Sequence, residues 1–251
     1  MLMFIFVATL LLSLVSPGQA QPDKETLSHA DALFNQYRAT ENLEPLKQST
    51  ALLDNLGKAA PGSYDIQWRR SRAYQSLGDD TKPASQKLKL LELAVAAGKQ
   101  AVEARGEGVE GHYWLGVSYG SYGEAKGMFK ALTLVKNIRK EMETVIRLDA
   151  AHANGGAYVV LGKIDFELPG AFGGNKKRAI EEYEQGLKIA PSNPLLKVYL
   201  AESYIDDKRK NEARLLLDQV LSAKQTAQLS PELRDAQHEA RKLYDKHFAK
   251  K

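Results

Sequence analysis

Residues 158–191 read YVVLGKIDFELPGAFGGNKKRAIEEYEQGLKIAP, and residues 199–220 read YLAESYIDDKRKNEARLLLDQV. Each stretch carries a leucine followed by a small residue, Leu161-Gly162 and Leu200-Ala201, and a later alanine, Ala179 and Ala213. The step from the leucine to the alanine is 18 residues in the first stretch and 13 in the second. The difference of 5 fits an insertion at residues 168–174, in the turn between two helices. A repeated pair of helices with a period of about 34 residues therefore explains both stretches.

Earlier copies of this pattern can be traced towards the N-terminus. Leu115-Gly116 matches the first helix of a third copy, Tyr74 and Gly78 match a fourth, and Ala30 with Phe34 matches a fifth. We therefore expect helix pairs near residues 25–61, 63–106, 109–150, 153–191 and 194–225, and a capping helix near 230–248. We also expect the capping helix to turn Leu233, His238, Ala240 and Leu243 towards the array.

This spacing is that of the tetratricopeptide repeat (TPR), and it predicts an all-α fold, a TPR-like α-solenoid of about five helix pairs plus a C-terminal capping helix. Small residues such as Gly162 and Ala179 let paired helices approach closely, and larger ones such as Tyr183 fill the space beside them. A generic helical bundle with accidental matches is the alternative.

The first residues of the chain differ from the rest. Residues 1–20 carry no charged side chain, include the apolar stretch 4–15 and end in SPGQA. This pattern indicates a signal peptide over residues 1–20, cleaved after Ala20, followed by a helical repeat domain over residues 21–251. We expect a periplasmic protein. A retained N-terminal membrane anchor is the alternative, because no Lys or Arg precedes the apolar run.

The composition argues against several classes of function. The chain has no Cys, so it has no disulfide, thiolate metal site or Cys nucleophile. The net charge is +4, and the cations are spread among many acids without a dense basic block, so we expect no nucleic acid partner. The five His are scattered and no catalytic motif appears. We expect no enzyme activity, no catalytic residues, no cofactor and no metal site.

Three segments carry a more specific resemblance. They are WRRSRAY at residues 68–74, YWLG at 113–116 with GEAKG at 123–127, and LPGAFGGNKK at 168–177. With them the chain resembles the TatT family, the TPR-containing T component associated with TRAP transporters. More distantly, it is similar to the regulator-of-microtubule-dynamics TPR proteins. The TatT resemblance implies a periplasmic helper subunit that contacts a solute-binding protein and shelters a small apolar or anionic ligand in transit. The chain lacks the Cys that follows the signal in lipoprotein members.

The first helices of TPR pairs line a concave face, and residues at fixed offsets from the core pair point into it. These offsets select the following ligand- or partner-binding candidates, beside Val117 and Val159: Trp68, Arg69, Arg72, Tyr113, Trp114, Lys163, Phe166, Tyr199 and Glu202. Aromatic side chains beside cations suit an apolar ligand with a carboxylate head, or an extended peptide of a partner protein. Packing between helices is the alternative for the two Trp, and a solvated helix face is the alternative for the two Arg.

The loop at residues 170–177 is a second candidate site. Backbone amides at the start of the following helix, beside Lys176 and Lys177, could hold an anion, or the glycines could simply allow a longer turn. Two functions remain open from the sequence: a transport accessory that holds an organic acid or apolar ligand, and an interaction scaffold in envelope or secretion assembly that binds a peptide alone.

Overall fold

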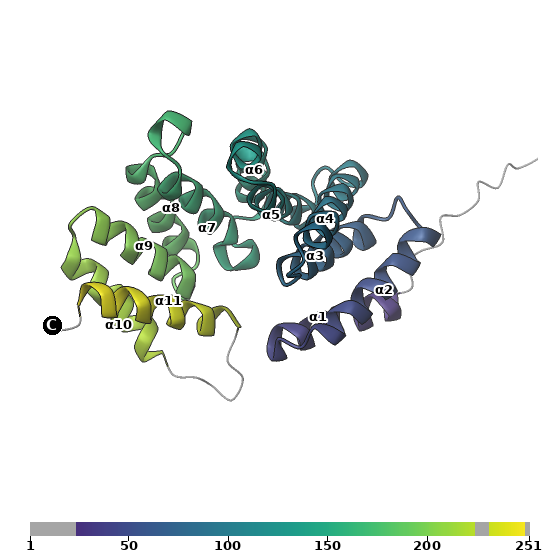
Figure 1. The fold of residues 1–251 in the computed structure, drawn as a ribbon, viewed down its shortest axis with the longest axis horizontal. Helices are drawn as coiled ribbons and strands as arrows, with labels where there is room; N and C mark the ends of the chain where they lie inside the picture. Colours follow the sequence, from purple (N-terminus) through teal and green to yellow (C-terminus); the bar gives the residue numbers. More distant parts are fainter. Residues whose placement is uncertain (1–23, 224–230, 249–251) are drawn as a thin grey trace, which may run out of the picture.

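The computed structural model describes residues 24–223 and 231–248 (Figure 1). The expected signal peptide at residues 1–20 lies outside the described residues. Within the described residues the chain forms eleven α-helices and one 3₁₀ turn: α1 Lys24–Thr40, α2 Leu43–Ala59, α3 Tyr64–Asp79, α4 Ala84–Ala104, α5 Val109–Lys126, α6 Met128–Asp149, α7 His152–Glu167, η1 Gly170–Phe172, α8 Lys176–Ile189, α9 Pro194–Asp206, α10 Lys210–Ser222 and α11 Pro231–His247. None of these helices is long and apolar enough to cross a membrane.

Consecutive helices pack as antiparallel pairs, from α1 with α2 to α9 with α10, and α11 packs on α9 and α10. The prediction of an all-α TPR-like solenoid of five pairs and a final helix is confirmed. Figure 1 shows α4, α6 and α8 outside α3, α5 and α7, so the first helices of these pairs face the interior of a curved array. The extra residues of the third pair lengthen α5 and α6, which are joined by Gly127 alone.

Asparagine side chains start several of the helices. Asn42 accepts a hydrogen bond from the Glu44 amide at the start of α2, and Asn175 accepts one from the Arg178 amide at the start of α8. Asn193 accepts from the first amides of α9, with Pro194 in the first turn. Each cap satisfies a backbone N–H that has no partner within the helix, and losing such a cap costs about 1 kcal/mol.

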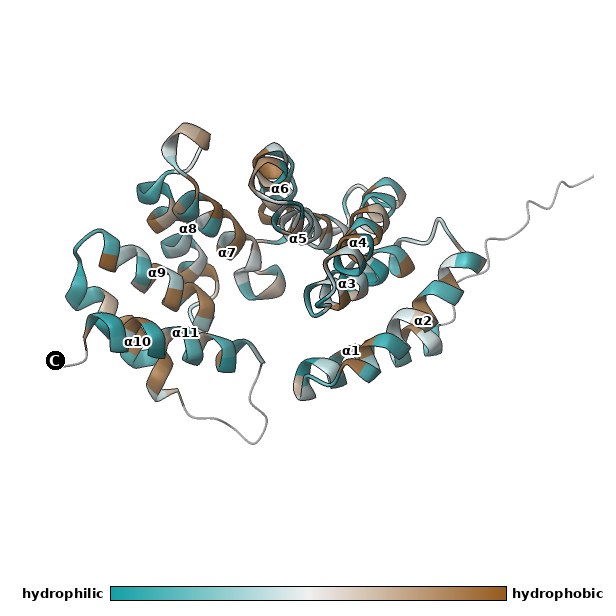
Figure 2. Cartoon of the chain, in the orientation of Figure 1, coloured by the Kyte–Doolittle hydropathy of each residue, from teal (hydrophilic) through white to brown (hydrophobic). Residues whose placement is uncertain are grey.

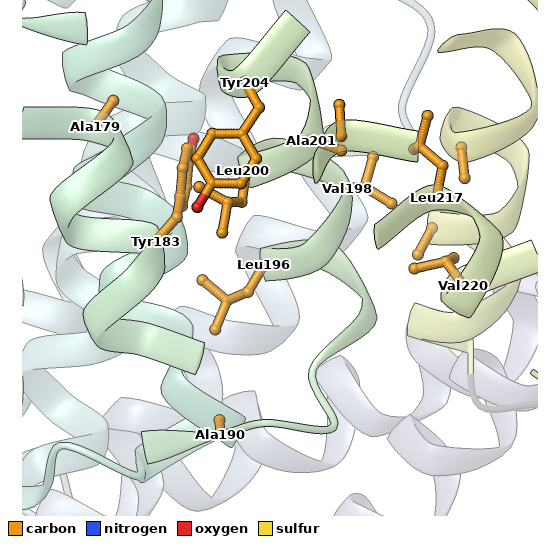
Figure 3. Close-up of a cluster of buried hydrophobic side chains, with 13 residues drawn as sticks. Ala179, Tyr183, Ala190, Leu196, Val198, Leu200, Ala201, Tyr204, Leu217 and Val220 are labelled. Carbon is orange, nitrogen blue, oxygen red and sulfur yellow. The ribbon is translucent and has the colours of Figure 1, made fainter. Parts of the chain in front are cut away.

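The core alternates small and large side chains across the helix pairs. Figure 2 shows that most helices carry both hydrophilic and hydrophobic residues, as amphipathic helices do. In the C-terminal core, Tyr183 of α8 lies against Leu196 and Leu200 of α9, beyond which Leu217 of α10 is also buried (Figure 3). Gly162 of α7 faces the Tyr183 ring, and an added Cβ would lie 2.3 Å from a ring carbon. The close approach of α7 and α8 therefore depends on glycine at position 162.

The inner face of α11 differs from the prediction. The buried residues of α11 are Ala236 and Ala240, and Leu243 is half-buried, whereas His238 is exposed. Ala236 and Ala240 are one turn apart and share a face, and a residue midway between them points to the other side of a helix. The expectation that His238 faces the array was therefore wrong. The expected helix start at Ser230 lies outside the described residues.

The two ends of the array come together at α11. Arg38, near the end of α1, forms an ion pair of 2.9 Å with Glu232, and Arg234 pairs with Glu41. Figure 1 shows the start of α11 beside one end of α1. Exposed ion pairs contribute only about 0–1 kcal/mol each to the free energy of unfolding. Their main effect here is to align the two ends of the array.

A buried histidine ties α5 to α6. Nδ1 of His112 lies 2.5 Å from a Glu141 carboxylate oxygen, and Nε2 lies 2.8 Å from the Gly106 carbonyl oxygen. Both neighbours are acceptors, so both ring nitrogens donate when the imidazole is protonated. The hydrogen bond with Glu141 raises the pKa of His112 above its ordinary value, against the opposing effect of burial.

Replacing His112 with glutamine should therefore cost stability in a pH-dependent way. A histidine pKa that is raised in the folded state stabilises fully below the unfolded pKa of about 6.5. That contribution is lost as the pH rises through the folded-state pKa. We expect His112→Gln to lower the free energy of unfolding by about 2 kcal/mol at low pH, and by less at high pH. Urea unfolding at both pH values measures this. The exposed His238→Gln variant is the control, and an equal loss for His112→Gln at both pH values would contradict the expectation.

Candidate functional site

The curved array encloses a central cleft of about 1340 Å³. Helices α1, α3, α5 and α7 supply its wall, the loop before α9 and the end of α10 supply its base, and the start of α11 closes one side. Its apolar lining consists mainly of Phe34, Tyr113, Trp114, Val117, Val159 and Leu195. Small-molecule pockets usually have volumes of roughly 300–1,000 Å³, so this cleft has room for more than one small ligand.

Tyr113 is the centre of the aromatic wall. Its ring meets the Trp114 ring edge to face at 5.3 Å between centroids, and it meets the His152 ring at 5.1 Å. Burial, with a smaller effect of Glu232, raises the pKa of Tyr113 to about 12. The phenol therefore keeps its proton at neutral pH and offers a hydrogen-bond donor within an apolar wall.

The polar part of the lining combines amides with a few charges. Asn35 and Gln219 line the cleft from opposite ends of the chain, and each amide can both donate and accept hydrogen bonds. Lys197 lies half-buried at the base, and the ion pair between Arg38 and Glu232 stands at the side that α11 closes. The cleft therefore has no strong excess of either charge.

Three consecutive residues at the start of α7, two of which line the cleft, have left-handed backbone. The φ angles of Ala153, Asn154 and Gly155 are 50°, 55° and 75°. Two of these residues carry a Cβ, and such residues seldom adopt this conformation. The Asn193 side chain donates a hydrogen bond of 2.6 Å to the Asn154 carbonyl oxygen and holds the turn. Strained backbone of this kind is often found at binding sites, and no sequence signal pointed to it.

The structure places some of the predicted binding residues in the cleft. Tyr113 and Trp114 line it, as do Val117 and Val159. Trp68 lies behind this wall, buried with Tyr64 and Ala101, and Trp114 packs against that group. Of the two Trp, one thus lines the cleft while the other supports it.

Arg69 and Arg72 turn towards α1. Both guanidinium groups bind the Asp31 carboxylate, Arg69 at 2.9 Å and Arg72 at 2.5 Å. The Arg69 guanidinium also stacks over the Trp68 ring at 4.2 Å. Burial lowers the pKa of Arg72, and among the described residues its Nε is the one buried side-chain nitrogen or oxygen atom with no hydrogen-bond partner. Neither arginine lines the cleft. Both have a structural role in the ion pairs with Asp31, and their binding role stays a prediction.

The other four predicted residues form a separate group on α7 and α9. Lys163 pairs with Glu167 at 3.7 Å, Tyr199 stacks on Tyr183, and the Lys176 ammonium lies over the Phe166 ring. Burial, together with Glu167, raises the pKa of Glu202. Lys163, Phe166, Tyr199 and Glu202 do not line the cleft. The predicted site is therefore divided among three places.

Sequence reasoning missed the part of the cleft that comes from the ends of the array. Phe34, Arg38, Leu195 and Lys197 all line the cleft. The repeat offsets select residues in the second to fifth helix pairs and none in α1. The Asn193-Pro194 pair indicates a helix start and so could have predicted the base of the cleft. No local sequence pattern predicts the curvature that brings α11 to α1.

The glycine-rich loop is explained by a buried carboxylate. Asp165 is fully buried and accepts hydrogen bonds from Arg139 at 2.5 Å and Arg178 at 2.6 Å. Both arginines also donate to the Gly173 carbonyl oxygen. The loop between α7 and α8 is thereby tied to α6, and no local sequence pattern indicated that Asp165 is its anchor.

The anion-binding interpretation of this loop is not favoured. Lys176 pairs with Asp206 at 2.7 Å, and the Asn175 side chain caps α8. The adjacent hollow of about 430 Å³ contains the cations Lys176, Lys177 and Arg209 and the acids Glu181, Glu184, Asp206 and Asp207. An anion in this hollow would meet more carboxylates than cations. In the described part of the chain no group of three or more His, Asp or Glu is placed to hold a metal ion.

Comparison with known proteins agrees with this architecture. A solved thermophilic TPR protein, TTC0263 of Thermus thermophilus, superposes with a TM-score of 0.62 at 18% identity, covering 87% of this chain and 96% of its own, which shows a shared fold. A search of the curated proteins finds no match. A tetratricopeptide repeat profile matches residues 174–236. The profile of regulator of microtubule dynamics protein 1-3 matches residues 26–169, more than half of the chain, and the chain therefore belongs to that family.

Proposed function

We propose that this protein is a non-enzymatic TPR scaffold that holds an extended, largely apolar segment of a partner protein in its central cleft. The carrying observation is the cleft itself, about 1340 Å³ of space with Phe34, Tyr113 and Trp114 on its wall. TPR arrays use their concave surfaces to bind partners, and aromatic side chains provide large contact areas at low entropic cost.

The polar lining suits a peptide backbone. An extended segment brings N–H and C=O groups into the cleft, and each needs a partner when water is displaced. Asn35 and Gln219 can supply both donors and acceptors, and the Tyr113 hydroxyl adds a donor. The near balance of charge favours a segment without a strong net charge.

A second candidate is a TatT-like transport accessory that acts in the periplasm, after export through residues 1–20, and docks on a solute-binding protein. Lys197 beside the apolar walls supports it, because an ammonium next to aromatic and aliphatic side chains suits an organic acid with an apolar tail.

Introducing a charge into the cleft tests the proposal. Val117→Glu places a carboxylate on the apolar wall, and we expect at least tenfold less bound partner, because an unpaired buried charge costs more than about 1.4 kcal/mol. Native mass spectrometry of the chain purified from its own cells measures the bound species. Leu215→Glu is the matched control, because Leu215 is 63% exposed on α10 and lies outside the cleft.

The identity of the bound species separates the two candidates. A second polypeptide that Val117→Glu removes supports the scaffold, and a small acid recovered by organic extraction supports the transport accessory. A bound polypeptide that Val117→Glu leaves in place would contradict the cleft as its binding site.

A further inference from the structure

The corner between α5 and α6 exposes apolar side chains on the outside of the array. Helix α5 ends at Lys126, Gly127 turns the chain with a φ of 99°, and α6 begins at Met128. Met128 is 69% exposed and Phe129 is 88% exposed, the largest values among the exposed large apolar residues of the described chain. Two adjacent apolar side chains in water indicate a surface that another body covers.

Close backbone contacts hold the corner. The Gly127 amide donates to the Gly123 carbonyl oxygen at 3.0 Å, and a Cβ added at Gly123 would lie 2.9 Å from the Ala131 Cα atom. The two helices therefore meet closely just behind Met128 and Phe129. The backbone of the corner is therefore ordered before contact, and only the two apolar side chains lose rotamer freedom on binding.

Cations follow the apolar pair along α6. Between Glu124 and Glu141 the chain has five Lys or Arg residues and no acid. Lys130, Lys136 and Lys140 are exposed, and within the described part of the chain they form no ion pair. Lys136 and Lys140 lie 7 and 11 residues after Phe129. The three side chains therefore share one face of α6 over about 16 Å. We call Met128, Phe129, Lys130, Lys136 and Lys140 the α5–α6 tip.

Most of the other charged residues near the tip are paired. Arg139 is held by Asp165, and Lys126 is paired with Glu92 at 3.8 Å. Glu141, next to Lys140, is buried against His112, and the acids exposed near the tip are Glu124 on α5 and Glu143, one turn beyond Lys140 on α6. The Lys130 ammonium lies 5.9 Å from the Tyr122 ring, which brings a further aromatic close to the corner. The tip therefore combines apolar, aromatic and cationic groups with a positive balance.

We propose that the α5–α6 tip docks on an anionic lipid bilayer, with its two apolar side chains in the interface and its lysines on the headgroups. Phe with Lys or Arg on the polar side is the pattern of interfacial membrane binding, and each cation near an anionic surface adds to the affinity. This site is independent of the cleft and goes beyond the proposed scaffold function.

Other occupants fit the tip less well. A nucleic acid would use the lysines but would leave Met128 and Phe129 exposed to water. A protein partner needs about 20–30 residues on each side, whereas the apolar part of the tip is two residues at a convex corner that lines neither of the two hollows described above. A bilayer needs no complementary groove.

Vesicle co-sedimentation of the full chain tests the proposal. We expect binding to phosphatidylcholine vesicles that contain about 30 mol% phosphatidylglycerol, and weaker binding at high salt. Met128→Ser with Phe129→Ser should weaken it about tenfold or more, and so should Lys136→Glu with Lys140→Glu. The matched controls are Leu215→Ser for the apolar change and Lys188→Glu with Lys210→Glu for the charge change. All variants keep the same N-terminal residues, so a difference in vesicle binding between the variants measures the contribution of the tip.

A fluorophore at the tip separates insertion from adsorption elsewhere. The chain has no Cys, so Met128→Cys creates a single labelling site, and Leu215→Cys creates its control. An environment-sensitive label at position 128 should shift to the blue on addition of the anionic vesicles, and a label at position 215 should not. The proposal is overturned by absence of vesicle binding, by equal binding of the tip and control variants, or by no spectral shift at position 128 in vesicle-bound protein.

Discussion

Replacing Gly162 with leucine is expected to lower the free energy of unfolding by about 3 kcal/mol, because the new side chain must enter space that the Tyr183 ring fills. The Cβ alone would lie 2.3 and 2.6 Å from two ring carbons. Tyr183 is 1% exposed and is held by α9, so the ring has nowhere to move. The pair α7–α8 must therefore open, and the neighbouring pairs lose the surface they share with it.

The matched control for this change is a glycine in open space. Gly120 of α5 has no atom within 4 Å of an added Cβ. Gly120→Ala should raise stability by about 0.5–1 kcal/mol through helix propensity, whereas Gly162→Ala should lower it. Urea unfolding followed by circular dichroism measures both variants. A stabilising Gly162→Ala would contradict the close packing of α7 on α8.

Replacing Asp165 with alanine should have an effect of similar size, about 3 kcal/mol, because it leaves Arg139 and Arg178 without their shared carboxylate. The loss should fall at the lower end of the range for buried ion pairs, since the Arg178 side chain is 42% exposed and can turn to water. The loop between α7 and α8 should also detach from α6. Hydrogen exchange at residues 168–175 measures this release.

Glu167→Ala on the same helix is the control, because its ion pair with Lys163 is exposed and should contribute less than about 1 kcal/mol. Burial alone would raise the pKa of Asp165, but hydrogen bonds from Arg178 and Arg139 lower it overall. The stabilisation is then present above the unfolded pKa of about 3.9, and it is lost as the pH falls through the folded-state pKa. A loss for Asp165→Ala that matches Glu167→Ala at pH 7 would contradict the buried network.

The sequence predicted the fold because its decisive landmarks are local. Leu161-Gly162 and Leu200-Ala201 mark the close approach of paired helices, and such approaches recur with the repeat period. The buried face of α11 was harder to predict. The helix is mostly polar, and His238 and Ala240 lie on different faces of it. The small residues Ala236 and Ala240 face the array.

The candidate site was less predictable than the fold. Tyr113 and Trp114 line the cleft as their offsets indicate, but the offsets cannot tell that Asp31 of α1 draws Arg69 and Arg72 away. That ion group joins residues about 40 positions apart, and the side of the cleft that α11 closes joins α11 to α1. Such long-range contacts depend on the curvature of the whole array, which no single repeat records.

Site-specific photo-crosslinking tests the central claim, that partners bind in the cleft, most directly. A photoreactive amino acid at position 117 faces the cleft, and one at position 215 faces solvent on α10. After irradiation in the cells that make the protein, we expect a crosslinked polypeptide from position 117 and none from position 215. Crosslinks from position 215 with none from position 117 would place the binding surface on the outside of the array and would contradict the claim.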